Sequence, residues 1–256
     1  MKNRFAVLLA VAAAAAAMAG ISLSGQTSAI TVQDLTCEYL VNPLGIDTDR
    51  PRLSWRLTPG ARGRMQSAYQ ILVASSPENL QENQGDLWNS GKVNTSQSVL
   101  VPYGGRPLNS RMRVWWKVRV WDENGRPSQR SAPARWSMGL LRPTDWQARW
   151  IGMPHPEGAK PGAPLPFPWQ RKTVDLKQRP TWATACVNDQ GYYQLYVSDK
   201  KVDDYVLVPA VSDFSSRNLC LTHDVTHYLT PGENVIALWL GRGWYVRGHP
   251  GVIHDG

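Results

Sequence analysis

The stretch from Met112 to Trp121, MRVWWKVRVW, alternates strictly between two kinds of side chain and limits the possible folds more than any other segment. If the chain is extended, the side chains on one side are all apolar, and those on the other side are two cations flanked by tryptophans. The first side consists of Val114, Trp116, Val118 and Val120, and the second of Trp115, Lys117, Arg119 and Trp121. A segment that alternates with a period of two and is rich in β-branched and aromatic residues is typical of a half-buried antiparallel strand. The chain therefore needs a layered β architecture.

Further segments of the same type surround this strand and are separated by turn residues such as Pro59-Gly60 and Gly104-Gly105. Several short strands within about 100 residues, with turns between them, predict a β-sandwich. We place this first module at residues 31–142. Its other predicted strands are Arg52–Leu57, Ala68–Ser75, Gln97–Val101 and Ala134–Met138.

Six prolines fall between Met153 and Trp169, where regular sheet hydrogen bonding is excluded. Residues 143–169 are therefore predicted to connect two modules. Residues 170–256 contain fewer strand patterns, so the second module is predicted to be a truncated, jelly-roll-like sandwich. The fold class is all-β. The strands expected in the second module are Thr181–Val187, Tyr192–Val197, a short one near Val202, and Asn234–Leu240, with a helical turn at 224–229.

The N-terminus has the order of an export signal, with Lys2 and Arg4 before an apolar run from Phe5 to Ala19. Small residues suit cleavage after Ala19 or Ala29, and we take residues 1–29 as the signal peptide. The mature protein is expected to be periplasmic or extracellular, without a membrane segment. One disulfide is possible in such a compartment. The three cysteines are Cys37, Cys186 and Cys220, and buried free thiols are the favoured alternative.

The net charge of +8 is concentrated in one part of the chain. Residues 31–150 contain 16 Lys and Arg against 10 Asp and Glu, whereas residues 151–256 contain 10 of each. The arginines are scattered singly and no nucleic-acid-binding motif accompanies them. We therefore exclude a nucleic-acid partner and expect a solvated or interdomain basic face.

Several short motifs resemble bacterial α-L-rhamnosidases over about residues 32–256. In the first module these are Asn42–Thr48, Arg50–Trp55, Gln66–Val73, Leu87–Gly91, Trp115–Asp122 and Trp150–Gly152. In the second they are Gly191–Val197, Asp224–Thr226, Pro231–Ile236 and Leu240–Tyr245. The resemblance implies a fibronectin-type-III-like domain followed by the rhamnosidase N-terminal β-sandwich. Two departures, Ser198-Asp199 in a hairpin where the family has Asn-Gly and Asp203 where it tends to have Gly, put the local turn geometry in question.

The resemblance also implies inverting hydrolysis of terminal α-L-rhamnosides, with the acid and base on a helical barrel whose motifs do not occur in this sequence. No catalytic residue is therefore assigned, and the chain alone is expected to be inactive. Its expected partners are the missing barrel of the same polypeptide and rhamnose-containing glycans or glycosides. The alternative is a stand-alone carbohydrate-binding or adhesion sandwich without catalysis.

The sequence contains only weak candidates for a catalytic, metal-binding or nucleotide-binding site. Asp203 and Asp204 are adjacent, so on a strand they point to opposite faces and make a poor acid–base pair. His223 and His227 are spaced to bind zinc, but a third ligand is lacking, and packing is the better interpretation. No phosphate-binding or dinucleotide-binding glycine motif is complete. We predict no cofactor and no metal.

Most of the 12 tryptophans lie in alternating strands, where core packing is expected. The exceptions follow the last strand, after a Gly-Arg-Gly turn. This loop is the candidate for contact with carbohydrate or with another domain, and its candidate residues are Arg242, Trp244, Tyr245, Arg247 and His249.

Overall fold

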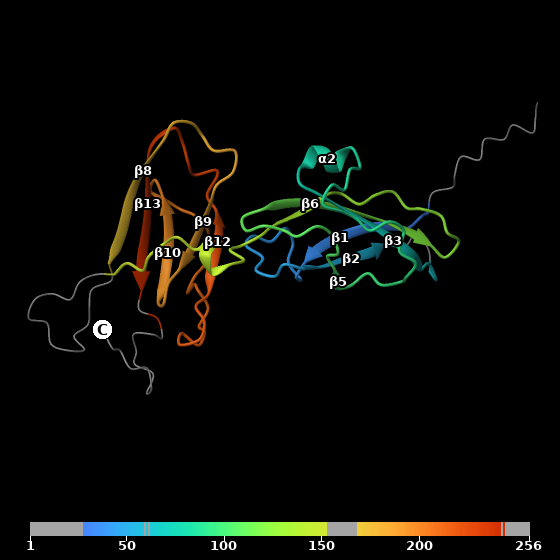
Figure 1. Cartoon of the computed structure of the whole chain (residues 1–256), viewed down its shortest axis with the longest axis horizontal. Coiled ribbons are helices and arrows are strands. Elements are labelled where there is room, and N and C mark those ends of the chain that lie inside the picture. Colours follow the sequence, from blue (N-terminus) through green and yellow to red (C-terminus); the bar gives the residue numbers. More distant parts are fainter. Residues whose placement is uncertain (1–27, 59, 61, 153–167, 242, 244–256) are drawn as a thin grey trace, which may run out of the picture. The chain divides into compact units, whose positions relative to one another are not determined.

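The computed structural model describes residues 28–58, 60, 62–152, 168–241 and 243 of the 256-residue chain (Figure 1). Its contacts divide the chain into two compact units. The first unit comprises Met1–Val41, Arg50–Arg106 and Val114–Arg135. The second comprises Asn42–Asp49, Pro107–Arg113 and Trp136–Gly256. Within the described residues, the helices are too short or too polar to cross a membrane.

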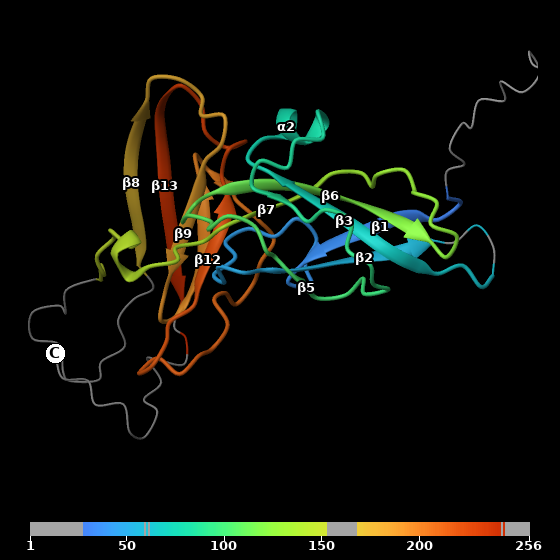
Figure 2. The same ribbon diagram turned by 45° about the vertical axis from the view of Figure 1, so that its right-hand side comes forward.

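Two antiparallel sheets make up the first unit, apart from Arg113, Trp136 and Ser137, which belong to the second (Figures 1 and 2). The three-stranded sheet has the order β1 (Thr31–Cys37), β2 (Arg52–Thr58), β5 (Val101–Pro102). The four-stranded sheet has the order β4 (Trp88–Asn89), β3 (Gln66–Ala74), β6 (Arg113–Asp122), β7 (Ala134–Ser137). The short helix α2 (Pro77–Gln81) follows β3, and the Ser76 side chain caps it by accepting from the Asn79 N–H.

Strand β6 confirms the alternation read from the sequence. Its inward residues Val114, Trp116, Val118 and Val120 are completely buried, and they face the core of the sandwich. Trp55 from the opposite sheet lies edge-on to Tyr69, with 5.2 Å between ring centroids. The Trp55 indole N–H donates to Gln66 Oε1 at 3.0 Å, so this buried donor has a hydrogen-bond partner within the aromatic core.

The structure of the first unit differs from the sequence prediction at β5 and at β1. Of the predicted strand Gln97–Val101, only Val101 belongs to β5, because Leu100 adopts a positive φ of 53° that breaks the extended chain. Strand β1 was not predicted. A bulge interrupts its pairing with β2 between Gln33 and Thr36, where Asp34 has a φ of 51°, so no regular alternation is visible in the sequence.

The second unit contains a four-stranded and a two-stranded antiparallel sheet, preceded by the 3₁₀ turn η1 (Pro143–Asp145). The larger sheet has the order β11 (Lys200–Lys201), β10 (Tyr192–Val197), β13 (Gly232–Gly241), β8 (Trp169–Leu176). The smaller pairs β12 (Cys220–Asp224) with β9 (Thr184–Asn188). Apolar side chains from both sheets form one core, whose buried members are Val187, Tyr193, Leu195, Val197, Val202, Val225 and Leu229.

The sequence predicted β10 with its observed bounds and β13 to within two residues at its start and one at its end. The hairpin between β10 and β11 keeps two residues at positive φ, Ser198 at 47° and Asp199 at 69°, as a two-residue hairpin turn requires. The departure from Asn-Gly therefore leaves the geometry of this turn intact. Residues 226–228 form a turn instead of a helical turn, and β8 and β12 were not predicted.

Candidate functional site

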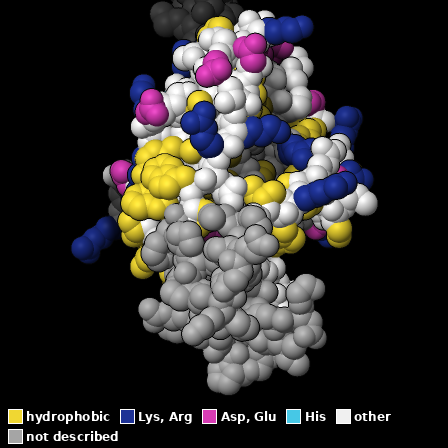
Figure 3. Space-filling model, turned by 90° about the vertical axis from the view of Figure 1, so that its left-hand side faces the viewer, with side chains coloured by type: hydrophobic (Ala, Val, Ile, Leu, Met, Phe, Trp, Pro, Cys, Tyr) yellow, Lys and Arg dark blue, Asp and Glu magenta, His cyan; other side chains and the backbone are white. Residues whose placement is uncertain are grey.

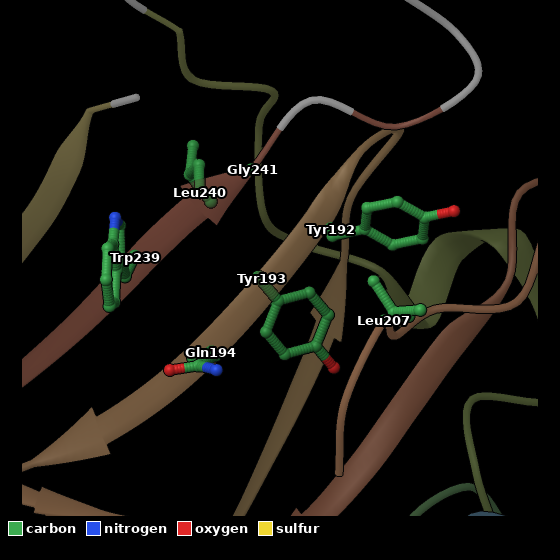
Figure 4. A pocket seen from close by; sticks show the side chains of 7 residues that line it. All are labelled: Tyr192, Tyr193, Gln194, Leu207, Trp239, Leu240 and Gly241. Carbon is green, nitrogen blue, oxygen red and sulfur yellow. The ribbon is translucent and has the colours of Figure 1, made fainter. Parts of the chain in front are cut away.

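A cavity of about 360 Å³ lies where the end of β13 meets the beginning of β10 (Figure 4). Leu207 closes one side, from the segment that follows β11. The volume falls within the range typical of small-molecule sites, and the lining is mainly aromatic and aliphatic. The lining residues are Tyr192, Tyr193, Gln194, Leu207, Trp239, Leu240 and Gly241.

Two glycines allow the backbone to come together at the edge of this cavity. A Cβ atom at Gly191 would lie 2.3 Å from the carbonyl oxygen of Gly241, and one at Gly243 would lie 2.6 Å from the Gly191 Cα. Neither position tolerates a side chain without backbone movement. The cavity edge therefore depends on the Gly191 and Gly243 positions.

The outer face of the four-stranded sheet carries a row of aromatic side chains next to the cavity. Trp169 on β8 pairs directly with Trp239 on β13, and their rings stack with 5.1 Å between centroids and 14° between planes. Tyr196 on β10 lies 5.5 Å from Trp169 across Ala237, whose small side chain leaves room for this contact. Trp169 and Trp239 remain 56% and 44% exposed. We call Trp169, Trp239 and Tyr196 the aromatic face.

Polar groups lie among these rings. Gln194 is paired with Trp239 across the strands, and the Tyr196 hydroxyl donates to its amide oxygen at 2.9 Å. Arg171 occupies the β8 position opposite Ala237 and is exposed. Figure 3 looks onto the side of the second unit that carries β8 and shows hydrophobic side chains with Lys and Arg side chains between them. Flat exposed rings with hydrogen-bonding side chains at their edges suit a ligand that has both apolar and hydroxyl surfaces.

Beneath the cavity, a buried hydrogen-bond chain joins three segments. The Tyr193 hydroxyl lies 2.7 Å from His223 Nε2, and His223 Nδ1 lies 2.5 Å from Asp203 Oδ2. Burial raises the pKa of the Tyr193 phenol, with nearby negative groups adding to the effect, so the phenol keeps its proton. Tyr193 therefore donates to Nε2, and Nδ1–H donates to the Asp203 carboxylate.

The Tyr193–His223–Asp203 hydrogen bonds hold the wall of the cavity in place, and none of these three side chains is arranged as a catalytic group. The phenol is held protonated, which removes it as a nucleophile. His223 is 4% exposed, and both of its ring nitrogens are used within the protein. Asp204, next to Asp203, is exposed and does not share the buried surroundings of His223.

The described residues contain no cluster of three or more His, Cys, Asp or Glu side chains that could hold a metal ion. His227 is exposed in a turn, whereas His223 is buried in β12, so the two are separated. A different set of oxygens lies at the β9 end, where Asn188 Oδ1, Asp189 Oδ2 and Asn218 Oδ1 are buried without a partner among the described residues. Burial raises the pKa of Asp189.

Cys186 and Cys220 meet on the paired strands β9 and β12. Cys186 pairs with Thr222, two residues from Cys220, so the two thiols are diagonal neighbours on one face. Both are free, as is the buried Cys37. A hydrogen bond from the Cys220 thiol, followed by one from Thr222, lowers the pKa of Cys186 to about 6. The same interaction, followed by burial, raises the pKa of Cys220, so Cys186 is the thiol of the two that ionises first.

The five residues predicted for carbohydrate or interdomain contact, Arg242, Trp244, Tyr245, Arg247 and His249, lie outside the described residues. Gly241, immediately before them, lines the cavity. The sequence interpretation missed Trp169 and Trp239 as surface aromatics. The signal that reveals them is the pairing of β8 with β13, which sets both tryptophans on the face opposite the core residues Ile236 and Leu238.

Two family models match the chain. Residues 32–142 match the Rha78A-like N-terminal immunoglobulin domain, and residues 178–251 match the α-L-rhamnosidase N-terminal domain. The α-L-rhamnosidase of Streptomyces avermitilis is 41% identical over an alignment of 228 residues that covers 82% of this chain and 22% of that enzyme. One from Formosa agariphila is 35% identical over an alignment of 222 residues that covers 80% of this chain and 23% of that enzyme.

Among solved structures, the α-L-rhamnosidase from Dictyoglumus thermophilum is similar with a TM-score of 0.77 and 34% identity. The match covers 85% of this chain and 26% of that one. The chain thus spans about a quarter or less of the length of the relatives that it matches.

Proposed function

We propose that this chain, which consists of the N-terminal immunoglobulin-like domain and the N-terminal domain of the α-L-rhamnosidases, is the non-catalytic, sugar-contacting part of an exported α-L-rhamnosidase. The complete enzyme hydrolyses terminal α-L-rhamnosides with inversion, on a barrel domain outside these 256 residues. Residues 1–29 direct export to the periplasm or the exterior. The aromatic face and the adjoining cavity contact rhamnose-containing glycans.

The placement of carboxylates supports a non-catalytic role. An inverting glycosidase needs an acid and a base roughly 6.5–9.5 Å apart, on opposite sides of an enclosed sugar. The described cavity is lined by no carboxylate. Asp175 and Glu233 do face each other across β8 and β13, but both are exposed on an open sheet surface. Such a surface does not enclose the scissile bond.

One observation carries the assignment of sugar contact, namely the exposed stacked pair Trp169 and Trp239. Exposing two indoles costs free energy, since burial of an aromatic side chain of this size is worth about 2 kcal/mol or more. A pyranose ring covers an indole with its C–H face while its hydroxyls reach hydrogen-bonding neighbours. Gln194 and Arg171 are the neighbours in reach of such a ligand. The predicted contact residues Arg242 to His249 follow Gly241 and remain part of this proposal.

A second candidate is a stand-alone carbohydrate-binding or adhesion protein. The aromatic face and the cavity favour it as much as they favour an accessory part of an enzyme. The two candidates differ in whether this chain acts together with a catalytic barrel. Activity of the chain joined to such a barrel, compared with that of the barrel alone, distinguishes them.

Calorimetric titration with L-rhamnose and with a rhamnosylated oligosaccharide tests the sugar contact. We expect binding by the mature chain and loss of binding in the Trp169→Ala, Trp239→Ala double variant. The matched control is Trp150→Ala, which removes an equally exposed tryptophan elsewhere in the second unit. Absence of binding by a folded wild-type chain would refute the sugar contact. Assay with p-nitrophenyl α-L-rhamnoside should give no turnover, and turnover would refute the non-catalytic role.

A further inference from the structure

Three cations of the first unit converge on the outer face of its four-stranded sheet. Lys117 and Arg119 lie on β6 at the positions that point away from the core. Residues Ser128 and Ser131 hydrogen-bond to β6 along the side opposite β3, through Ser128 N to Val120 O and Ser131 N to Val118 O, both at 2.8 Å. Arg130 is therefore held beside β6, next to Lys117 and Arg119.

The Arg130 side chain extends across β6 to the neighbouring strand. Its Nη2 donates to Gln70 Oε1 on β3 at 3.1 Å, and Gln70 pairs with Arg119 in the sheet. The other end of the Gln70 amide donates to Asn89 Oδ1 at 2.9 Å, which fixes the orientation of its oxygen. The Arg130 guanidinium is thus positioned over the strand that carries the other two cations.

Three donor atoms of this cluster are buried and lack acceptors among the described residues. Arg119 Nε, Arg130 Nε and Arg130 Nη1 have no hydrogen-bond partner among the described residues and are shielded from solvent. Lys117 is 9% exposed. Burial, followed by the charges of Arg130 and Arg119, lowers the pKa of the Lys117 ammonium, and burial together with Arg119 lowers that of Arg130. The three cations therefore repel one another in a partly dry site.

No anionic side chain among the described residues compensates this charge. The arginine–carboxylate ion pairs found there join Arg52 to Glu38, Arg56 to Asp34, Arg64 to Glu123 and Arg142 to Asp145. The aromatic ring of Trp121, on the same face of β6, is already covered by Lys92 at 5.0 Å. Buried charges without partners are strongly unfavourable, and buried donors are normally satisfied by an acceptor, either an ordered water or a bound ion.

We propose that Lys117, Arg119 and Arg130 form a binding site for a small oxyanion, either a tetrahedral sulfate or phosphate group or the carboxylate of an acidic sugar. Neighbouring guanidinium and ammonium groups make charge-assisted hydrogen bonds to such oxygens. The anion neutralises the repulsion between the three cations and accepts from the unpartnered Arg119 and Arg130 donors. This site lies in the first unit and is independent of the sugar contact proposed for the second.

Thermal unfolding in sodium sulfate, sodium phosphate or sodium D-glucuronate, against sodium chloride at matched ionic strength, tests this site. At about ten times the dissociation constant we expect the oxyanion to raise the Tm of the wild-type chain by about 2–4 °C over chloride. The tetrahedral anions and the glucuronate separate the two sources of the oxyanion. The Arg130→Gln and Lys117→Met variants should lose the increase, while the exposed-site control Arg62→Gln should keep it.

Without oxyanion, Lys117→Met should unfold at a higher temperature than the wild type, because the substitution removes a buried charge at similar length. If this variant does not fold, the Nε–H resonances of Arg119 and Arg130 in the wild type provide a second measurement. Both should shift and saturate as sulfate is added. An equal Tm increase in wild type, Arg130→Gln and Arg62→Gln, or resonances that do not move, would overturn the proposal.

Discussion

The first unit and the larger sheet of the second use tryptophan in opposite ways. The first unit buries Trp55 and Trp116 in its core, whereas the larger sheet of the second unit exposes Trp169 and Trp239. The core of the second unit consists mainly of valine and leucine, with one tyrosine whose hydroxyl is tied to His223. Identical strand alternation therefore produces a core in one unit and a candidate binding surface in the other. What differs is whether another layer covers the aromatic side of the strand.

The largest expected effect compares a buried with an exposed tryptophan. Trp116→Ala should lower the free energy of unfolding by about 3–5 kcal/mol, because it leaves a cavity in a closely packed core. Trp239→Ala should cost less than about 1 kcal/mol, because its ring is half in water already. Chemical denaturation followed by circular dichroism measures both. Similar losses for the two variants would contradict the contrast between the units.

A second experiment concerns the polar chain that supports the core of the second unit. Tyr193→Phe removes the donor to His223 Nε2 and leaves a buried nitrogen without its partner. The expected loss is about 1–3 kcal/mol in the free energy of unfolding. Tyr196→Phe, which removes an exposed-face hydroxyl bonded to Gln194, is the matched control and should cost about 0.5 kcal/mol or less. Equal costs would mean that the buried chain does not stabilise the core.

A third experiment uses the buried carboxyl at the end of β9. Burial raises the pKa of Asp189 in the folded state, so its ionisation opposes folding. Asp189→Asn should therefore increase stability by about 1 kcal/mol at neutral pH. The gain should shrink as the pH falls through the raised folded pKa and vanish below the unfolded value of roughly 3.9. A gain that grows toward acid pH would contradict this assignment, and Asp204→Asn serves as the exposed control.

The smallest effect on stability is expected at the cysteine pair, where reactivity changes instead. Cys186, with a pKa of about 6, should react with iodoacetamide at pH 7 faster than an ordinary thiol. Cys220→Ala removes the donated hydrogen bond and should slow this reaction by about tenfold or more, with little change in Tm. Mass spectrometry of alkylated peptides measures the rate. An unchanged rate in Cys220→Ala would show that the two thiols do not interact.

Sequence patterns sufficed for the strands with a clean alternation. In β6 and β10 every second residue is apolar and buried, so the period alone locates them. Strand β8, WQRKTVDL, escaped prediction because it lies at the sheet edge and exposes charged or polar residues on both sides. Strand β1 was not predicted because its bulge interrupts the alternation of apolar and polar residues. The overall class, two consecutive β-sandwich regions, followed from the regular strands.

The residues of the candidate sites were harder to predict from the sequence, because the sites depend on pairing between segments far apart in the chain. Alternation sets Trp239 on one side of β13, but only the pairing with β8 shows that its neighbour is another exposed indole. In the first unit, alternation places Lys117 and Arg119 on the same side, and a solvated or interdomain basic face was expected. Arg130 joins them through a contact across β6 that no local pattern encodes, and the three become partly buried.

The central claim is that the second unit presents its exposed tryptophans to sugar. Its most direct test is a titration of the ¹⁵N-labelled mature chain with a rhamnosylated oligosaccharide, followed through the indole N–H resonances. We predict that the Trp169 and Trp239 signals shift and saturate together, while those of the buried Trp55 and Trp116 stay in place. Trp169 and Trp239 signals that remain fixed at saturating oligosaccharide would contradict the account.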